Sequence, residues 1–182
     1  DIAIRDLNAP LQRDPACSGP LHVLLHFKGY IALEAYRISN HLWQRGQSEL
    51  AKRLHHSISH ALHVSIHPSA VIGNSLFIDH GTGVTVGRDV VIEDDVSMLQ
   101  DVTLSSLIDG SVGAPRIGRG VLLSAGATVL GNVEVGDFAK IGAGSLVLTS
   151  IPSGCTAVGV PARLAGRTPE PQPALSMAQS LP

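Results

Sequence analysis

The sequence predicts a parallel β-helix preceded by a helical segment, because aliphatic residues recur every six positions over its second half. Thirteen residues keep this spacing within three blocks: Ile66, Ile72 and Ile78; Val86, Ile92, Met98 and Leu104; and Ile117, Leu123, Val129, Val135, Ile141 and Val147. Glycine directly follows five of them, as in Ile72-Gly73. Neither the 3.6-residue period of a helix nor the alternation of a strand gives this pattern. Hexapeptide periodicity is typical of a parallel β-helix.

The composition agrees with this fold and excludes several classes of protein. The chain is 44% hydrophobic but only 3% aromatic, which suits coils stacked at roughly 4.8 Å around a narrow aliphatic interior. A net charge of −2 without a long basic run argues against a nucleic-acid surface. No apolar stretch approaches the ~20 residues of a membrane helix, and no signal peptide is recognised. With two distant cysteines, Cys17 and Cys155, we expect a cytoplasmic protein with reduced thiols.

Three segments are expected along the chain. Residues 1–63 form an α-helical N-terminal segment, in which Asp14 is expected to cap a helix that begins at Pro15, with breaks or turns at Gly29 and Gly46. Residues 64–166 form the β-helix. Residues 167–182, rich in Pro, Ser, Gln and Ala, are expected to form a flexible tail.

Two interruptions of the six-residue spacing are the first candidates for a functional site. Val86 follows Ile78 at a spacing of eight instead of six, so Asp79–Gly83 is expected to bulge from a coil corner. Ile117 follows Leu104 at a spacing of thirteen, so a loop near 105–114 is expected to project from the stack. Function concentrates where a regular scaffold is interrupted.

His80 is the strongest catalytic candidate, because an imidazole can take a proton from a hydroxyl near neutral pH and return it. Asp79 could hold this imidazole or a cationic group of a substrate, and the glycines that follow could let a ligand approach closely. The competing interpretation of His80 is an ordinary histidine of a surface loop.

No metal site is expected. His56 and His60 have the i, i+4 spacing of a helical metal site, but no carboxylate or cysteine completes it, which favours a solvated helix face. A zinc-dependent β-helix enzyme needs three histidines, and the coils contain only His67 and His80.

Several motifs resemble those of the serine O-acetyltransferases over most of the chain from Asp14 to Gly166. They are Arg13-Asp14-Pro15-Ala16, Leu25-His26-Phe27-Lys28-Gly29-Tyr30, Ile66-His67-Pro68, Asp79-His80-Gly81-Thr82-Gly83, Val102-Thr103-Leu104, Lys140-Ile141-Gly142-Ala143-Gly144-Ser145 and Gly159-Val160-Pro161-Ala162-Arg163.

The resemblance implies a left-handed β-helix, a homotrimer with active sites between subunits, and acetyl-CoA as the donor without a metal. By analogy His80 matches the general base, and Asp79 and Asp14 match acidic residues that contact the amino acid. The coil corners along which CoA runs match Ala125, Gly126 and Ala127, with Gly142, Ala143 and Gly144.

The departures from the family concern the acceptor. Ser65 stands where the family has an aspartate that pairs with the catalytic histidine, and Gly113-Ala114 stand where it has an Arg-His pair that holds the substrate carboxylate. Losing a cation opposite a carboxylate costs roughly 1.5–3 kcal/mol. Serine is therefore expected to bind poorly unless Arg116 or another group substitutes.

Our leading hypothesis is an acetyl-CoA-dependent O-acyltransferase that acts on serine or a serine-like acceptor, as in cysteine biosynthesis. Two alternatives remain: the same fold with a different acceptor, such as a modified or carrier-tethered amino acid, and a non-catalytic CoA-binding or regulatory homologue. Family members dock a sulfhydrylase through a C-terminal isoleucine. The sequence here ends Leu181-Pro182, so that docking is not expected.

Overall fold

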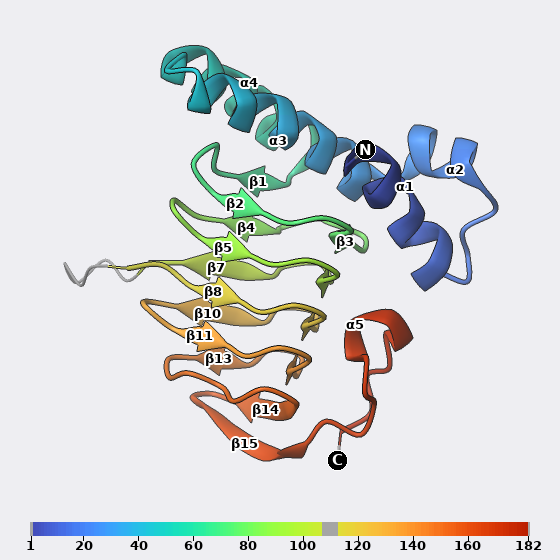
Figure 1. The fold of residues 1–182 in the computed structure, drawn as a ribbon, viewed down its shortest axis with the longest axis vertical. Helices are drawn as coiled ribbons and strands as arrows, with labels where there is room; N and C mark the ends of the chain where they lie inside the picture. The colour runs from blue at the N-terminus through green and yellow to red at the C-terminus, as the bar shows by residue number, and fades with distance from the viewer. Residues whose placement is uncertain (1, 107–112, 182) are drawn as a thin grey trace.

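In the computed structural model, which describes residues 2–106 and 113–181, three sheets of short strands form a stack of coils (Figure 1). Consecutive strands up to β13 enter the three sheets in turn, and β14 and β15 both join the third. The strand orders are β1-β4-β7-β10-β13, β11-β8-β5-β2 and β15-β14-β12-β9-β6-β3. All pairs are parallel except β14 with β15. The strands are β1 (Ser65–Ile66), β2 (Val71–Ile72), β3 (Phe77–Ile78), β4 (Thr85–Val86), β5 (Val91–Ile92), β6 (Ser97–Met98), β7 (Thr103–Ser105), β8 (Arg116–Ile117), β9 (Leu122–Leu123), β10 (Thr128–Leu130), β11 (Glu134–Val135), β12 (Lys140–Ile141), β13 (Leu146–Val147), β14 (Cys155–Gly159) and β15 (Ala162–Arg167).

The six-residue spacing marks the interior of this stack, as predicted. All thirteen residues of the series are buried, and the most exposed of them, Ile72, is only 7% exposed. A second buried series, which was not predicted, lies two residues before the first. Its hydrophobic members are Val64, Ala70, Leu76, Val84, Val90, Val96, Val102, Val121, Ala127, Val133 and Ala139. Each coil face therefore contributes two small inward side chains, which is why few aromatic residues fit.

The N-terminal segment contains four helices: α1 (Ile2–Arg13), α2 (Pro20–His26), α3 (Lys28–Gln44) and α4 (Ser48–Leu62). The expected helix start at Asp14-Pro15 is wrong. Asp14 follows the end of α1, and its side chain accepts a hydrogen bond from the backbone N–H of Ala16 (2.8 Å) in a turn. Gly46 makes the expected turn between α3 and α4, with φ +75°, whereas Gly29 lies in the first turn of α3. Among the described residues, no helix is both long and apolar enough to span a membrane.

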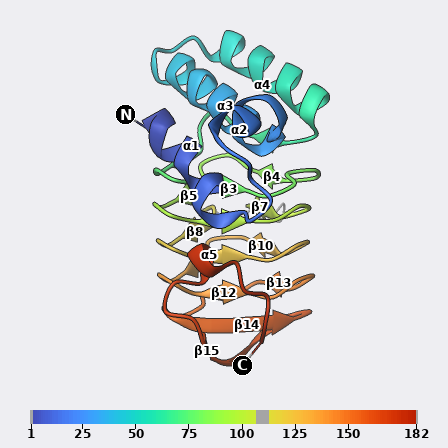
Figure 2. The same cartoon turned by 90° about the vertical axis from the view of Figure 1, so that its right-hand side faces the viewer.

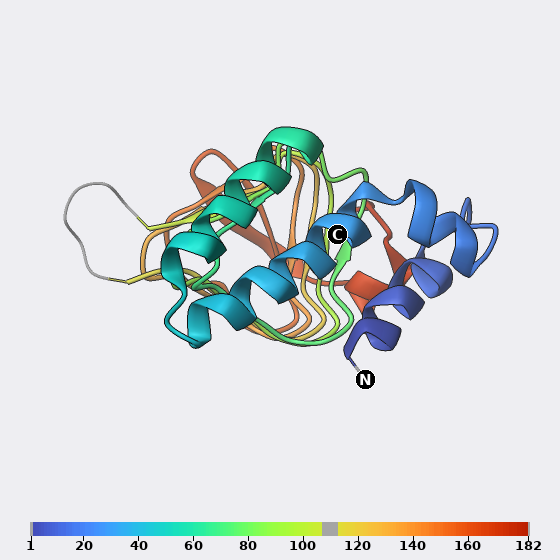
Figure 3. The same ribbon diagram turned by 90° about the horizontal axis from the view of Figure 1, so that it is seen from above.

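Helix α3 lies across the first coil, where β1, β2 and β3 each form the edge of a sheet (Figures 1 and 3). Carbonyls at such an edge have no further coil to pair with. Tyr36 Oη donates to the carbonyl of Ala70 (2.6 Å), and Asn40 Nδ2 donates to that of Pro68 (2.8 Å). Arg37 donates to the carbonyls of Ile72 (2.7 Å) and Gly73 (2.5 Å). Side chains of α3 thus form hydrogen bonds to carbonyls that another coil would otherwise bond.

The segment expected to be a flexible tail instead makes definite contacts. After β15, helix α5 (Pro173–Ser176) packs against β6 and β9, on the same side of the stack as α1 (Figure 2). The carbonyl of Ala174 accepts a hydrogen bond from Ser97 Oγ (2.8 Å). Lys140, which is fully buried, reaches the carbonyl of Ser180 and lies 3.8 Å from a carboxylate oxygen of Glu170. Polar side chains on the outer face of the sheet that contains β6, β9 and β12 thus bind the C-terminal segment. Its Pro-rich composition does not reveal these contacts.

Replacing Arg37 with methionine is expected to lower the free energy of unfolding by roughly 3–5 kcal/mol, because it leaves a buried carboxylate unpaired. Arg37 Nη2 lies 2.9 Å from Oδ2 of Asp6, and the Asp6 side chain is fully buried. Urea denaturation at neutral pH measures the change. The control is Lys52→Met, which breaks the exposed ion pair with Glu49 and should cost at most about 1 kcal/mol. Equal losses in the two variants would contradict the structural role of Arg37.

Candidate active site

The first interruption of the repeat forms a loop between β3 and β4, as predicted. The N–H of Asp79 still donates to the carbonyl of Met98 in the next coil (2.8 Å), and the N–H of Gly83 donates to the carbonyl of His63 (2.9 Å). Between these anchors His80 has a left-handed backbone, with φ +57°. Its side chain is 73% exposed. The loop therefore presents an imidazole at the surface on a fixed backbone.

The glycines beside His80 lie close to other parts of the protein. A Cβ on Gly83 would lie 2.0 Å from Oδ1 of Asp101, which belongs to the corner of the next coil. Gly81 is buried, and a Cβ there would meet Val64 and the Cα of Gly29. Small residues are thus needed here for packing, and their expected role in letting a ligand approach stays a prediction.

His80 borders an open pocket of about 230 Å³, which is lined by segments far apart in sequence. Its lining residues come from the end of α1, the junction of α2 and α3, and the end of β3. They are Asp14, His26, Phe27, Lys28, Gly29, Ile78, Asp79 and His80. Three of the predicted site residues, Asp14, Asp79 and His80, therefore share one pocket. Lys28 and His26 were not identified as site residues, because only the tertiary fold brings the start of α3 to this loop.

Two carboxylates give the pocket an acidic wall. Burial raises the pKa of Asp79, the neighbouring Asp14 carboxylate raises it further, and His80 opposes these effects. His80 Nε2 lies 3.8 Å from Oδ1 of Asp79, which is too far for a hydrogen bond. The carboxylate can thus interact with the imidazole as a charge while its oxygens remain able to accept hydrogen bonds from an ammonium group.

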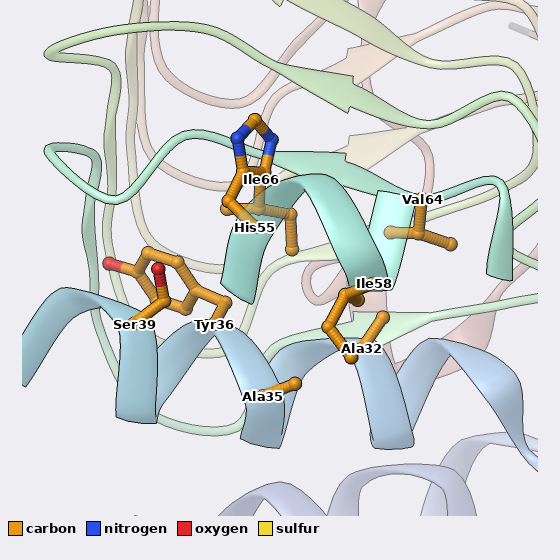
Figure 4. A pocket seen from close by; sticks show the side chains of 8 residues that line it. All are labelled: Ala32, Ala35, Tyr36, Ser39, His55, Ile58, Val64 and Ile66. Atoms are coloured by element: carbon orange, nitrogen blue, oxygen red, sulfur yellow. The ribbon is translucent and has the colours of Figure 1, made fainter. Parts of the chain in front are cut away.

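Ser65, which replaces the expected partner of the histidine, is engaged elsewhere. Its hydroxyl lies 3.0 Å from Nε2 of His55 on α4, and burial lowers the pKa of that imidazole. His55 also lines a small cavity between α3, α4 and β1, shown in Figure 4. This cavity has a volume of about 10 Å³, room for one water at most. The region is packing of α4 on the first coil.

His67, His56 and His60 make contacts within their own segments. His67 Nδ1 accepts a hydrogen bond from the N–H of Ser69 (3.1 Å) in the turn after β1. The rings of His56 and His60 lie 6.5 Å apart on α4. Within residues 2–106 and 113–181, no three His, Cys, Asp or Glu side chains are placed to hold a metal ion.

One edge of the stack connects the His80 loop to the glycine-rich corners. Backbone N–H groups of successive corners donate to the corner before: Asp101 to Thr82 (2.8 Å), Gly126 to Gln100 (2.9 Å), and Gly144 to Ala125 (2.8 Å). At the usual strand spacing these three steps span roughly 14 Å. Residues far apart in sequence therefore form one continuous edge, which we call the corner edge.

The six residues predicted to bind CoA divide into two groups along the corner edge. Ala143 and Gly144 are exposed, and Ala125 and Gly126 are partly exposed. The other two, Ala127 and Gly142, are buried; Ala127 belongs to the core, and a Cβ on Gly142 would meet Val158. The exposed pair and the partly exposed pair can contact a ligand, and the buried pair shapes the corners.

Arg116 does not line the pocket. It is exposed on β8, in the sheet of β2, β5 and β11, whereas Asp79 follows β3 in another sheet. The second interruption lies largely at 107–112, outside the described residues. Next to it, Gly113 packs so closely on Asn132 that a Cβ would lie 2.6 Å from the asparagine Cβ. Arg116 therefore brings no cation to the pocket within one chain, and position 113, a glycine, has no cationic side chain.

Comparisons with known proteins agree with this arrangement. Residues 1–35 match the family model "Serine acetyltransferase, N-terminal", and residues 114–149 match "Bacterial transferase hexapeptide (six repeats)". The curated serine acetyltransferase of Escherichia coli K12 is 47% identical over 175 residues, which are 96% of this chain and 64% of that protein. The chain thus spans less than two thirds of that relative.

Solved structures give the same result over the whole described fold. The crystal structure of serine acetyltransferase from Vibrio cholerae is 47% identical with a TM-score of 0.96, covering 98% of this chain and 70% of that one. The enzyme from Brucella abortus, solved in complex with coenzyme A, is 42% identical with a TM-score of 0.89, covering 92% and 67%. With this identity and coverage, the chain belongs to the serine acetyltransferase family.

Proposed function

We propose that the protein transfers an acetyl group from acetyl-CoA to the hydroxyl of serine. The observation that carries the proposal is the corner edge, which joins the exposed His80 to the small corners at Ala125-Gly126 and Ala143-Gly144. An extended thioester lying along these corners would bring its reactive end to the imidazole. The names of the relatives and the coenzyme A complex of the Brucella enzyme support the same donor and acceptor.

The proposed reaction needs one base and no acyl-enzyme. His80 removes the proton from the serine hydroxyl as its oxygen attacks the thioester carbonyl of acetyl-CoA. The tetrahedral intermediate then collapses with cleavage of the C–S bond. The departing CoA thiolate takes the proton back from the imidazolium, which leaves O-acetylserine, CoA and neutral His80. Asp14 and Asp79, which line the same pocket, hold the ammonium group of the acceptor.

The proposal extends to the architecture and the assembly. We propose a left-handed, closed β-helix over residues 64–166, after the helical segment 1–63 and before the segment 167–182. We further propose a homotrimer with a site beside each His80 loop. We also propose that the protein acts in the cytoplasm, with acetyl-CoA as its donor. The hexapeptide match and the likeness to solved serine acetyltransferases support the handedness. The open pocket and the exposed His80 leave room for a neighbouring copy.

A second candidate is the same transfer to a different acceptor. The observation in its favour is that Ser65 bonds His55 instead of supporting His80, and that neither Gly113 nor Arg116 brings a cation to the pocket. This candidate shares the donor and the base with serine acetylation, so the two differ only in which hydroxyl compound is consumed.

Replacing His80 with asparagine is expected to lower turnover by about 10²- to 10⁴-fold, because the base is lost. Asparagine tolerates the left-handed backbone of this position, so the loop should keep its shape. Release of CoA thiol from acetyl-CoA and L-serine measures the rate, and calorimetry checks that CoA affinity is unchanged. His60→Ala, on the exposed face of α4, is the control and should keep the parent rate.

Equal rates for the His80 variant and the parent would overturn the role of His80. A parent that releases thiol with other hydroxylated amines but not with L-serine would favour the second candidate. Binding of CoA without turnover on any acceptor would favour a non-catalytic homologue.

Enlarging the exposed corner residue Ala143 to leucine is expected to raise the KM for acetyl-CoA about tenfold or more, since the added side chain stands on the corner edge. The KM for serine should stay within about twofold. The matched control is Thr149→Leu, exposed at another corner of the stack. The same KM for acetyl-CoA in both variants would place the donor elsewhere.

Replacing Asp79 with asparagine is expected to stabilise the protein at pH 7.5 while weakening serine binding. Burial raises the folded-state pKa of Asp79, so the folded protein disfavours the charged carboxylate. The gain should be largest above that pKa and shrink as pH falls through it, because the parent side chain then becomes neutral too. Urea denaturation at pH 7.5 and pH 4 measures the gain. A variant that is less stable at pH 7.5 would contradict this account.

A further inference from the structure

The acceptor pocket contains a cation that no part of the proposed reaction uses. Among its described lining residues, Lys28 is the one with an ammonium side chain, and the carboxylates of Asp14 and Asp79 line the same pocket. An α-amino acid carries both an ammonium and a carboxylate. The carboxylates of the pocket account for the ammonium, and the carboxylate of the acceptor needs a cation.

Backbone packing places Lys28 beside the catalytic loop. The next residue, Gly29, sits so close to the end of β3 that a Cβ would lie 2.1 Å from the carbonyl oxygen of Ile78. Asp79 and His80 follow Ile78 directly. The start of α3 is therefore seated on the strand that leads into the His80 loop, and a side chain at position 28 must lie near that loop.

A hydrogen bond fixes the direction of the Lys28 side chain. Lys28 Nζ donates to the Thr82 hydroxyl, two residues after His80. An ammonium group has three N–H donors, so this bond uses one and leaves two. Among the ion pairs of the described residues, none joins Lys28 to Asp14 or Asp79. Lys28 therefore lines the pocket beside the His80 loop with two donors available for a ligand.

We propose that Lys28 binds the carboxylate of the amino-acid acceptor and thereby selects acceptors with a free carboxylate. This inference rests on the proposed function and names the residue that sets its specificity. The acceptor would lie with its ammonium at Asp14 and Asp79, its carboxylate at Lys28, and its hydroxyl at His80. Lys28 on the rigid start of α3 then supplies the cation that Arg116, on another sheet, does not bring to this pocket within one chain.

The test compares L-serine with L-serinamide, which keeps the ammonium and the hydroxyl but lacks the negative charge. The parent is expected to prefer L-serine by about tenfold or more, both in kcat/KM and in affinity measured by calorimetry at pH 7. Lys28→Gln keeps a donor for Thr82 but removes the charge. It is expected to raise the KM for L-serine roughly 10- to 100-fold and to change that for L-serinamide less than threefold.

Two further variants separate binding of the carboxylate from support of the loop. Lys28→Arg keeps the charge and should retain part of the preference for L-serine. Thr82→Val removes the hydrogen bond but leaves the lysine, and should weaken L-serine binding less than Lys28→Gln does. The KM for acetyl-CoA and the thermal midpoint should stay close to the parent values in all three variants.

A similar loss for both acceptors in Lys28→Gln would overturn the proposal, because a structural role of the lysine affects them alike. So would a parent that binds L-serine and L-serinamide equally, or binds neither. A parent that binds L-serine with the preference, loses it in Lys28→Gln, yet does not acetylate serine would support Lys28 while rejecting the proposed function. The failures of the two proposals are thus distinguishable.

Discussion

The structure depends on parallel backbone hydrogen bonding between successive coils. From β1 to β13, each strand pairs with the strand three places later in sequence, as β3 with β6 and β6 with β9, so each of these coils repeats the shape of the previous one. This repetition forces the interior to accept only small aliphatic side chains in two series, and it aligns the corners. The corner edge is a direct consequence, because the same hydrogen bonds connect Thr82 to Asp101 and Ala125 to Gly144.

The first coil has no preceding coil to bond its edge carbonyls. Helix α3, which bonds them instead, also forms part of the pocket. Helix α3 covers the first coil and donates side-chain hydrogen bonds to its carbonyls through Tyr36, Arg37 and Asn40. The close seat of Gly29 on Ile78 fixes the start of the same helix against β3. As a result the element that ends the sheets also carries Lys28 to the His80 loop. Helix α3 therefore contributes both to the stability of the stack and to the geometry of the acceptor pocket.

The fold was largely predictable, because a period of six records a constraint that acts in every coil. The inward positions, the bulge at Asp79–Gly83 and the helical N-terminal segment followed from spacing. The start of the first helices and the contacts of the C-terminal segment did not. Asp14-Pro15 resembles a helix start, yet α1 already occupies the preceding residues. Lys140 and Ser97 hold the C-terminal segment through outward side chains, which the repeat leaves unspecified.

The candidate site was predictable in part. Asp14, Asp79 and His80 were identified from motifs, and the structure places them on one pocket. Lys28 was quoted within a motif but given no role, since nothing local shows that a residue at the start of a helix faces a loop fifty residues later. The packing role of the loop glycines was not predicted, because the sequence cannot show that Asp101 and Gly29 occupy the space beside them.

The central claim is that one edge of the stack carries the donor to the base, and a crystal structure with CoA and L-serine tests it most directly. We expect the pantetheine arm along Ala125-Gly126 and Ala143-Gly144, with the thiol next to the imidazole of His80 and the serine hydroxyl. CoA bound on another face of the coils, with its thiol away from His80, would contradict the account.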